Sequence, residues 1–320
     1  MTRPHLLRLA RMALLLVVLV AAGYALWRNW SEVAATWGSL TVRTWLPSLL
    51  AVPAGIVCAT LSWQVFVDDL GEPVGAARGA QIFLVGQLGK YVPGSVWAYV
   101  LQLELGRRAG VARARIFAAT VFSLAVAVVA ALLVGSLAIP ALVDANPALE
   151  RLPWLYVLLP IGVVCLHPRI LTWAVERGFR LLGRPAPGHP IRKRTVLRSL
   201  AWAVASYGCF GGHVWLLTRA VVVPTFENLG LTVGAMALAM ISGLFVFLLP
   251  SGAGIRETVL VAALAPAVGT GRAVAYAAIS RVFLTVSDLV MAGGAAGLAW
   301  LDRRRHGAYH GDPGIEPDED

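Results

Sequence analysis

The sequence predicts an all-α, polytopic membrane protein made of two inverted halves, with about six transmembrane helices and two re-entrant helical hairpins. Three observations carry this prediction: the composition, the length of the apolar runs, and two apolar stretches that proline and glycine interrupt. Hydrophobic residues make up 58% and charged residues 14% of the 320 residues, and the mean hydropathy is +0.73. A soluble domain of this length is much more polar.

The apolar runs have the length of membrane spans. An α-helix needs about 20 residues to cross a hydrocarbon layer of ~30 Å. Runs of this kind cover Met12–Trp27, Trp45–Val67, Ile116–Pro140, Pro153–Ala174, Leu200–Val222 and Ala273–Leu301. Two more apolar stretches, residues 79–106 and 229–268, contain Pro-Gly and Pro-Ser-Gly breaks. We expect one integral membrane domain over residues 1–302, with halves of about 9–140 and 153–302, and a disordered cytoplasmic tail over 303–320.

The first span has two interpretations. Arg3, Arg8 and Arg11 precede its apolar run, a pattern that a cleaved signal peptide also shows. A retained helix is favoured because the run continues to Trp27, an aromatic residue typical of the membrane interface. The sequence leaves cleavage of this helix open.

The two halves repeat one order of segments, which is a span, a second span, a broken apolar segment, a loop with arginine, and a span. Placing KYVPGSVW over FLLPSGAG aligns Pro93 with Pro250. At nearly the same offset, Arg113 aligns with Arg272. The run Trp45–Val67 falls over Leu200–Val222.

The basic residues test this topology independently. If each broken segment is a re-entrant hairpin, one side of the membrane holds the N-terminus, Arg78, the Arg107–Arg115 loop, the Arg169–Arg198 loop and Arg303–Arg305. The other side holds only Arg28, Arg43, Arg151, Arg219 and Arg272, while Lys90, Arg256 and Arg281 lie within membrane segments. Because cytoplasmic loops are rich in Lys and Arg, we expect both termini to be cytoplasmic. The net charge of +10 then reflects topology, and we expect no nucleic-acid partner.

The two breaks are the candidate functional site. Non-helical backbone at membrane depth leaves polar groups that only protein or a wet cavity can satisfy, so we expect a fold with two breaks to use them. Proline stops the helical hydrogen bonds and glycine permits a tight reversal. A helix that restarts after the turn offers free N–H groups and its positive dipole end to an anion. Arg256, in the first turn of such a helix, can add a guanidinium fork to a phosphate.

The candidate substrate-binding residues are those of the breaks and the charged residues near them. They are Lys90, Pro93, Gly94, Glu104, Pro250, Gly252, Gly254, Arg256, Glu257, Arg281 and Asp288. Charges at this depth are expected to face a cavity or one another. Structural ion pairs are therefore the alternative, namely Arg281 with Asp288, Lys90 with Glu104, or Arg256 with Glu257 or with another partner. Glu257 can also pair elsewhere. The first hairpin also carries polar side chains at Gln81, Gln87 and Gln102.

No motif in the sequence predicts catalysis or metal binding. It contains no Ser/His/Asp set and no phosphate-loop signature. Cys58, Cys165 and Cys209 are isolated within apolar runs and form no metal-binding spacing. We therefore predict no catalytic residue, no metal and no cofactor.

Two stretches resemble a known family. They are GQLGKYVPGSVWAYVLQLELGRRAGV, Gly86–Val111, and FLLPSGAGIRETVL, Phe247–Leu260, and they are similar to the family named for the transmembrane region of lysylphosphatidylglycerol synthase. The resemblance extends over roughly residues 10–302 and by motif position adds Trp97 to the first hairpin. It implies a bacterial inner-membrane protein with re-entrant hairpins, related to the part of the synthase that moves aminoacylated phospholipid between leaflets.

The sequence also departs from that family. Many relatives read Pro-Gly-Gly where this chain reads Pro250-Ser251-Gly252, and others carry an acidic residue after a glycine in the first motif. No aminoacyltransferase domain follows residue 302, so synthase activity is not expected of this chain.

Residues and resemblance together predict a flippase-like transporter that moves a lipid or a lipid-linked headgroup across the inner membrane. The predicted partners are a phospholipid or a polyprenyl-phosphate-linked lipid, together with a soluble transferase encoded separately. One alternative is an architectural subunit of a cell-envelope lipid pathway. Another is a membrane-embedded enzyme acting on a lipid-linked substrate, with Glu257 or Asp288 as acid or base.

Overall fold

The computed structural model describes residues 23–24, 27–92, 96–145, 150–181, 190–245 and 252–306, and the elements in these ranges are all helices. Five of the described helices are long and apolar enough to cross a membrane. They are α3 (Val42–Asp69), α6 (Arg113–Gly135, continuing to Asp144 through further helical turns), α10 (Lys193–Thr218), α11 (Phe226–Phe245) and α13 (Thr270–His306). The predicted all-α, multi-pass fold is therefore confirmed.

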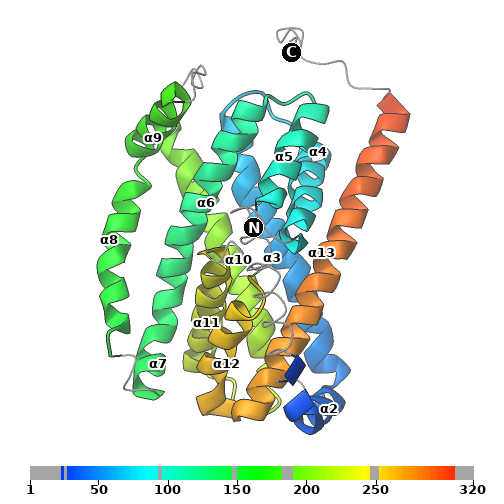
Figure 1. Cartoon of the computed structure of the whole chain (residues 1–320), viewed down its shortest axis with the longest axis vertical. Helices are drawn as coiled ribbons and strands as arrows, with labels where there is room; N and C mark the ends of the chain where they lie inside the picture. Colours follow the sequence, from blue (N-terminus) through cyan, green and yellow to red (C-terminus); the bar gives the residue numbers. More distant parts are fainter. Residues whose placement is uncertain are drawn as a thin grey trace, which may run out of the picture.

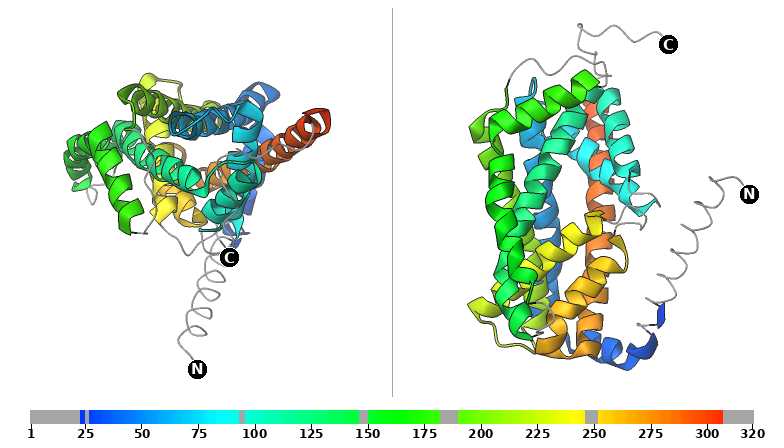
Figure 2. Two further views of the ribbon diagram at one scale, coloured as in Figure 1. Left: turned by 90° about the horizontal axis from the view of Figure 1, so that it is seen from above. Right: turned by 60° about the vertical axis from the view of Figure 1, so that its left-hand side comes forward.

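Four of these helices cover predicted spans, and they run along the long axis of the molecule (Figures 1 and 2). The predicted span Met12–Trp27 lies almost entirely outside the described residues. Helix α13 continues to His306, past the tail boundary expected at residue 302. Short helices complete the ends of the bundle, with α2 (Trp30–Ser39) and α7 (Ile139–Ala145) at the end opposite α9 (Figure 1).

The predicted span Pro153–Ala174 is not one straight helix. It consists of α8 (Leu155–Cys165) and α9 (Pro168–Leu181), and the chain bends by 75° between them. Pro168 is the first residue of α9, and a proline at the start of a helix disfavours helical backbone in the residue before it. Proline chemistry at this position therefore explains the bend.

The two broken segments each fold as a pair of limbs. The first comprises α4 (Ala76–Ala80), a π-helical stretch (Gln81–Val85), a 3₁₀ turn (Leu88–Tyr91) and α5 (Trp97–Arg108). The second comprises α11 and α12 (Ile255–Val268). Helices α4 and α5 lie in the half of the molecule that holds α9, whereas α12 lies in the half that holds α2 (Figure 1). Because α11 is itself long enough to cross a membrane, the re-entrant interpretation stays a prediction.

A glycine closes each pair of limbs. A Cβ on Gly89 would lie 2.5 Å from the backbone nitrogen of Ala98, on the return limb of the first hairpin. A Cβ on Gly252 would lie 2.6 Å from the Cα of Gly243, and Gly252 has a φ of 64°. At both positions the backbone of one limb touches the other, which only glycine permits.

Helices α3 and α10 pack closely against each other and run antiparallel. Ser48 Oγ lies 2.7 Å from His213 Nδ1, Ser206 Oγ donates to the Gly55 carbonyl at 2.8 Å, and the hydroxyls of Ser62 and Ser199 each donate to the other's backbone carbonyl at 2.9 Å. The contacts ascend from 48 to 62 on α3 while they descend from 213 to 199 on α10. These polar contacts fix the register of two otherwise apolar helices.

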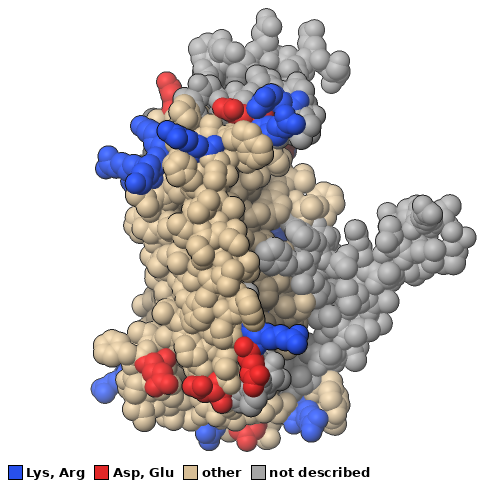
Figure 3. Space-filling model, turned by 90° about the vertical axis from the view of Figure 1, so that its left-hand side faces the viewer, with Lys and Arg blue, Asp and Glu red and all other residues tan. Residues whose placement is uncertain are grey.

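Charge separates the ends of the molecule from its middle. A broad band almost without charged side chains covers one face, Lys and Arg gather near the upper end, and the lower end carries both signs (Figure 3). The upper end is that of α5, α9 and the C-terminal end of α13, where the sequence analysis grouped most of the arginines (Figure 1). The band is what a hydrocarbon layer requires of a spanning protein.

Candidate functional site

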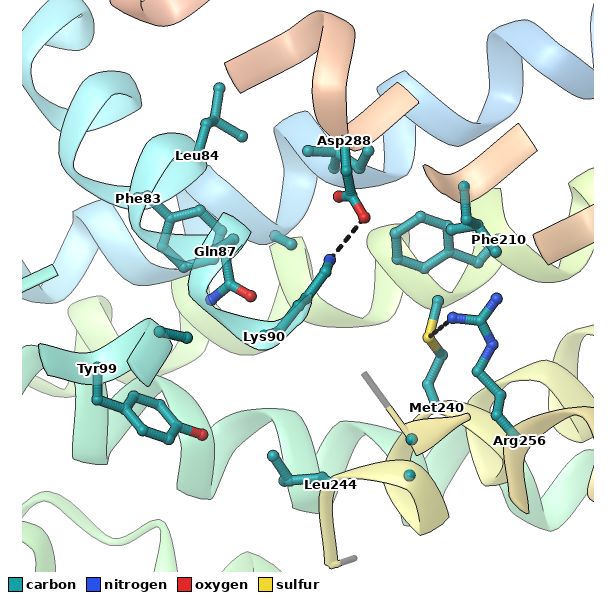
Figure 4. A pocket seen from close by; sticks show the side chains of 16 residues that line it. Phe83, Leu84, Gln87, Lys90, Tyr99, Phe210, Met240, Leu244, Arg256 and Asp288 are labelled. Atoms are coloured by element: carbon teal, nitrogen blue, oxygen red, sulfur yellow. Dashed lines mark hydrogen bonds and ion pairs between the residues drawn. The ribbon is translucent and has the colours of Figure 1, made fainter. Parts of the chain in front are cut away.

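A cavity of about 260 Å³ lies where the two hairpins meet α3, α10 and α13. We call it the charged cavity, and Figure 4 shows the side chains around it. Its walls include Leu84, Gln87, Lys90 and Tyr99 from the first hairpin, Met240, Leu244, Gly252 and Arg256 from the second, and Asp288 from α13. The described parts of the two broken segments predicted as the functional site therefore flank one space.

Lys90 and Asp288 form an ion pair across this cavity. Lys90 Nζ lies 2.7 Å from Asp288 Oδ2, and Tyr91 donates its hydroxyl hydrogen to the same oxygen at 2.6 Å. In Figure 4 the Lys90 side chain extends from the first hairpin toward Asp288. The charge of Lys90 is thus balanced by α13, and the pair joins the first hairpin to that helix.

Glu257 and Arg281 form a second link, between α12 and α13. Glu257 Oε2 accepts a hydrogen bond from the Gly254 backbone N–H at 2.7 Å, and Glu257 Oε1 accepts one from Arg281 at 3.1 Å. A glutamate at this position of the first helical turn satisfies one of the N–H groups that lack a partner within the helix. Gly254 precedes α12 with a φ of 88°, so glycine suits the turn. Glu257 therefore both caps α12 and ties it to α13.

Arg256 differs from these paired residues. Its relative exposure is 8%, it lines the charged cavity, and its guanidinium contacts the Met240 sulfur at 3.7 Å (Figure 4). Among the described residues it has no carboxylate partner within ion-pair distance. Lys90, Asp288 and Arg256 are the charged residues among the described cavity wall, so the wall carries one excess positive charge.

The ion pairs considered as the alternative are not the ones that form. Lys90 pairs with Asp288 rather than with Glu104, and Arg281 pairs with Glu257 rather than with Asp288. Glu257, taken by Arg281 and by the helix cap, is not the ion-pair partner of its neighbour Arg256. The reason is that the fold brings residues from distant segments closer to these side chains than their neighbours in the sequence or on the same helical face.

Other predicted residues lie away from the cavity. Glu104 is held by Arg107, Arg108 and Arg113, at 2.8, 2.9 and 3.4 Å, at the end of α5 that joins the arginine loop. Hydrogen bonds from Arg107 and then Arg108 keep the pKa of the Glu104 carboxyl well below its usual range. Trp97 begins α5 with half of its side chain exposed and is not part of the cavity wall. Pro93, Gly94 and Pro250 lie outside the described residues.

Several residues of this site carry little or no signal in the sequence. Tyr91 shares Asp288 with Lys90, and Met240 contacts Arg256. Phe210 enters the cavity wall because Gly55 leaves room for its ring, where a Cβ would lie 2.7 Å from Phe210 Cε1. The sequence offered one indication, the position of Tyr91 directly after Lys90. For the apolar residues of a span, the sequence does not show which face lines a cavity.

Five apolar helices of spanning length, a charge-poor band and a buried polar site at the centre define an all-helical, multi-pass membrane protein. The chain belongs to the lysylphosphatidylglycerol synthase TM region family, whose model matches residues 12–292. A search of the curated proteins found no match. Membership of this family links the protein to membrane lipids, with phospholipid as the general class of partner.

Proposed function

We propose that the protein binds phosphate-bearing lipid headgroups in the charged cavity and lets them pass between the leaflets of the bacterial inner membrane. The observation that carries the proposal is Arg256, a buried guanidinium without a carboxylate partner among the described residues. A buried charge without compensation costs several kcal/mol, of the order of 3–5. A bound anion removes that cost, so Arg256 is the residue expected to hold it.

The charge of the cavity wall suits a phosphodiester. With Lys90 and Asp288 paired, the excess is one positive charge, which a headgroup with a single negative charge neutralises. The guanidinium can donate two parallel hydrogen bonds to phosphate oxygens. The first turn of α12, where Arg256 lies, adds N–H groups without partners inside the helix and the positive end of its dipole.

The arrangement of the hairpins supports movement as well as binding. The hairpins lie toward opposite ends of the molecule and meet at the charged cavity (Figure 1). The helices that the sequence repeat aligns, α3 and α10, run antiparallel, as two inverted halves require. Rocking of inverted halves about a central site is a common way to expose it to each side in turn. We propose both termini on the cytoplasmic side, where the basic end would lie.

The site favours transport over catalysis. An acid or base must reach a reacting group, and Glu257 and Asp288 were the carboxylates considered for that role. Glu257 is used by the α12 cap and by Arg281, and Asp288 by Lys90 and Tyr91. Both carboxylates hold helices together in the observed structure.

Lipid movement in proteoliposomes tests the proposal. We expect the wild-type chain to move fluorescent phosphatidylglycerol between leaflets, and Arg256→Gln to slow this at least about ten-fold, because a charge-assisted hydrogen bond is lost. Arg219→Gln, which alters an exposed arginine after α10, is the matched control and should keep the wild-type rate. Equal rates in wild type and Arg256→Gln would refute the assignment of the site, and no movement by the wild type would refute the function.

A further inference from the structure

A second cavity adjoins the charged one. It measures about 250 Å³ and shares wall residues with the charged cavity, among them Phe83, Gln87 and Tyr99. Its described wall carries no charged side chain, and we call it the neutral cavity. Aromatic rings form much of the wall, including those of Trp63 and Tyr207. The two cavities are therefore neighbours, one with charged side chains in its described wall and one without.

A directed chain of hydrogen bonds leads to the neutral cavity. Trp63 donates its indole N–H to Thr120 Oγ1 at 3.1 Å, and Thr120 donates its hydroxyl hydrogen to Gln102 Oε1 at 3.3 Å. In this arrangement the oxygen of the Gln102 amide accepts from Thr120, and the amide nitrogen is left as a donor. That nitrogen is buried and has no acceptor among the described residues.

The position of Gln102 is fixed by close packing. Its relative exposure is 1%, and a Cβ on Gly86 would lie 2.3 Å from Gln102 Cγ. The side chain therefore packs directly against the backbone of the opposite limb of the first hairpin. Leaving a buried amide donor unpaired costs about 1–3 kcal/mol. We therefore expect a ligand in the neutral cavity to supply an acceptor for the Gln102 amide.

Gln87 provides a second amide at the junction of the two cavities. It lines both of them and makes no hydrogen bond to the other described residues (Figure 4). Its amide can donate one hydrogen bond and accept another at the same time. A hydroxyl group can be the partner in either bond, because it also donates and accepts. A hydrocarbon chain would satisfy neither amide, and an ammonium group would find no carboxylate in the described wall of the neutral cavity.

We propose that the neutral cavity binds an uncharged, hydroxyl-bearing group joined to the phosphate, such as a glycerol or a sugar, through Gln102 and Gln87. This inference rests on the proposed function, since it assigns the phosphate of the same headgroup to Arg256. The substrate class is then a lipid with a monoanionic phosphodiester and a neutral polyol headgroup. Aromatic walls suit such a group because its C–H faces can pack against rings while its hydroxyls meet the amides.

Native mass spectrometry of the purified full chain tests this inference. The protein is offered equimolar phosphatidylglycerol and phosphatidylpropanol with the same acyl chains, which differ only in the headgroup hydroxyls. We expect the wild type to retain phosphatidylglycerol about five- to ten-fold better, as for one or more hydrogen bonds to an otherwise unpaired donor. Phosphatidylinositol in place of phosphatidylglycerol distinguishes a sugar from a glycerol as the preferred group.

Variants at the amides separate this site from the phosphate site. Gln102→Met should bring the retention ratio toward one while leaving the retention of phosphatidylpropanol unchanged, and Gln87→Met, which alters the wall of both cavities, should also bring the ratio toward one. Gln81→Met is the matched control, because Gln81 lies on the same hairpin but lines neither cavity, and it should keep the wild-type ratio. Should Gln102→Met fold poorly, Thr120→Val, which removes the hydroxyl that orients Gln102, should lower the ratio in its place.

The outcomes are distinguishable from failure of the proposed function. A wild-type ratio near one, or a ratio that Gln102→Met and Gln87→Met leave unchanged, overturns the inference while the phosphate site stands. Equal loss of both lipids in Gln102→Met also overturns it, because this amide would then act on the fold alone. If the wild type retains no anionic lipid, the proposed function fails first and the inference with it.

Discussion

The two hairpins of this protein share one way of closing and differ in charge. In each, a glycine lets the backbones of the two limbs touch, at Gly89 in the first hairpin and at Gly252 in the second. Each also sends one basic side chain to the same cavity. Lys90 of the first hairpin pairs with a carboxylate of α13, whereas Arg256 of the second contacts a thioether and has no carboxylate within ion-pair distance among the described residues.

This difference separates a structural charge from a ligand-binding charge. A cation with a carboxylate partner contributes to holding two elements together, and the Lys90–Asp288 pair links the first hairpin to α13. A buried cation without such a partner destabilises the empty protein, and a bound anion reverses that effect. Sequence position alone gave both residues the same role, because both lie beside a break.

The largest effect on stability is expected at the glycines that let the two limbs touch in both hairpins. Gly252→Ala should destabilise the protein by about 3 kcal/mol or more, since a Cβ would overlap the Gly243 backbone and the φ of 64° disfavours L side chains. Gly89→Ala should be comparably harmful, because its Cβ would overlap Ala98. Thermal unfolding in detergent measures both.

Gly293→Ala is the matched control for these substitutions. A Cβ on Gly293 would meet no atom within 4 Å, so this variant should unfold at the wild-type temperature or slightly above it. A Gly252→Ala variant as stable as Gly293→Ala would show that the limbs do not touch in this way.

A smaller effect on stability is expected at the Lys90–Asp288 ion pair, which has no counterpart at Arg256 of the second hairpin. Asp288→Asn leaves Lys90 without its carboxylate and should lower stability by about 1–3 kcal/mol, and Lys90→Met should do so to a similar extent. The double variant should lose less than the sum of the two, with a coupling of about 1–2 kcal/mol. Thermal unfolding of the four proteins gives the coupling, and strictly additive losses would show that the pair contributes nothing.

Much of the fold could be predicted from the sequence because its signals are local. Apolar runs mark α3, α6, α10 and α13, and the two proline and glycine breaks mark the places where the limbs of each hairpin separate. The same reasoning missed the 75° bend before Pro168, since a run of apolar residues gives the length of a span and not its direction. The sequence also predicted α11 as one limb of a re-entrant hairpin, although that helix is long enough to cross a membrane.

The site could be predicted only in part, because its geometry depends on contacts between distant segments. The sequence placed Lys90, Arg256 and Asp288 within membrane segments, and the structure brings all three to one cavity. Which carboxylate meets which cation depends on how the first hairpin docks on α13, and no local pattern encodes that. Gln102 illustrates the same limit, since its unpaired amide becomes visible only when Thr120 and Trp63 are in place.

The most direct test of the central claim is the melting temperature of wild type and Arg256→Gln in detergent, each with and without phosphatidylglycerol. The account predicts that Arg256→Gln is more stable than the wild type without lipid, by about 2 kcal/mol, because an unpaired buried charge is removed. It also predicts that added lipid stabilises the wild type and Arg219→Gln but not Arg256→Gln. A variant that is less stable than the wild type without lipid, and that is still stabilised by lipid as strongly, would contradict the account.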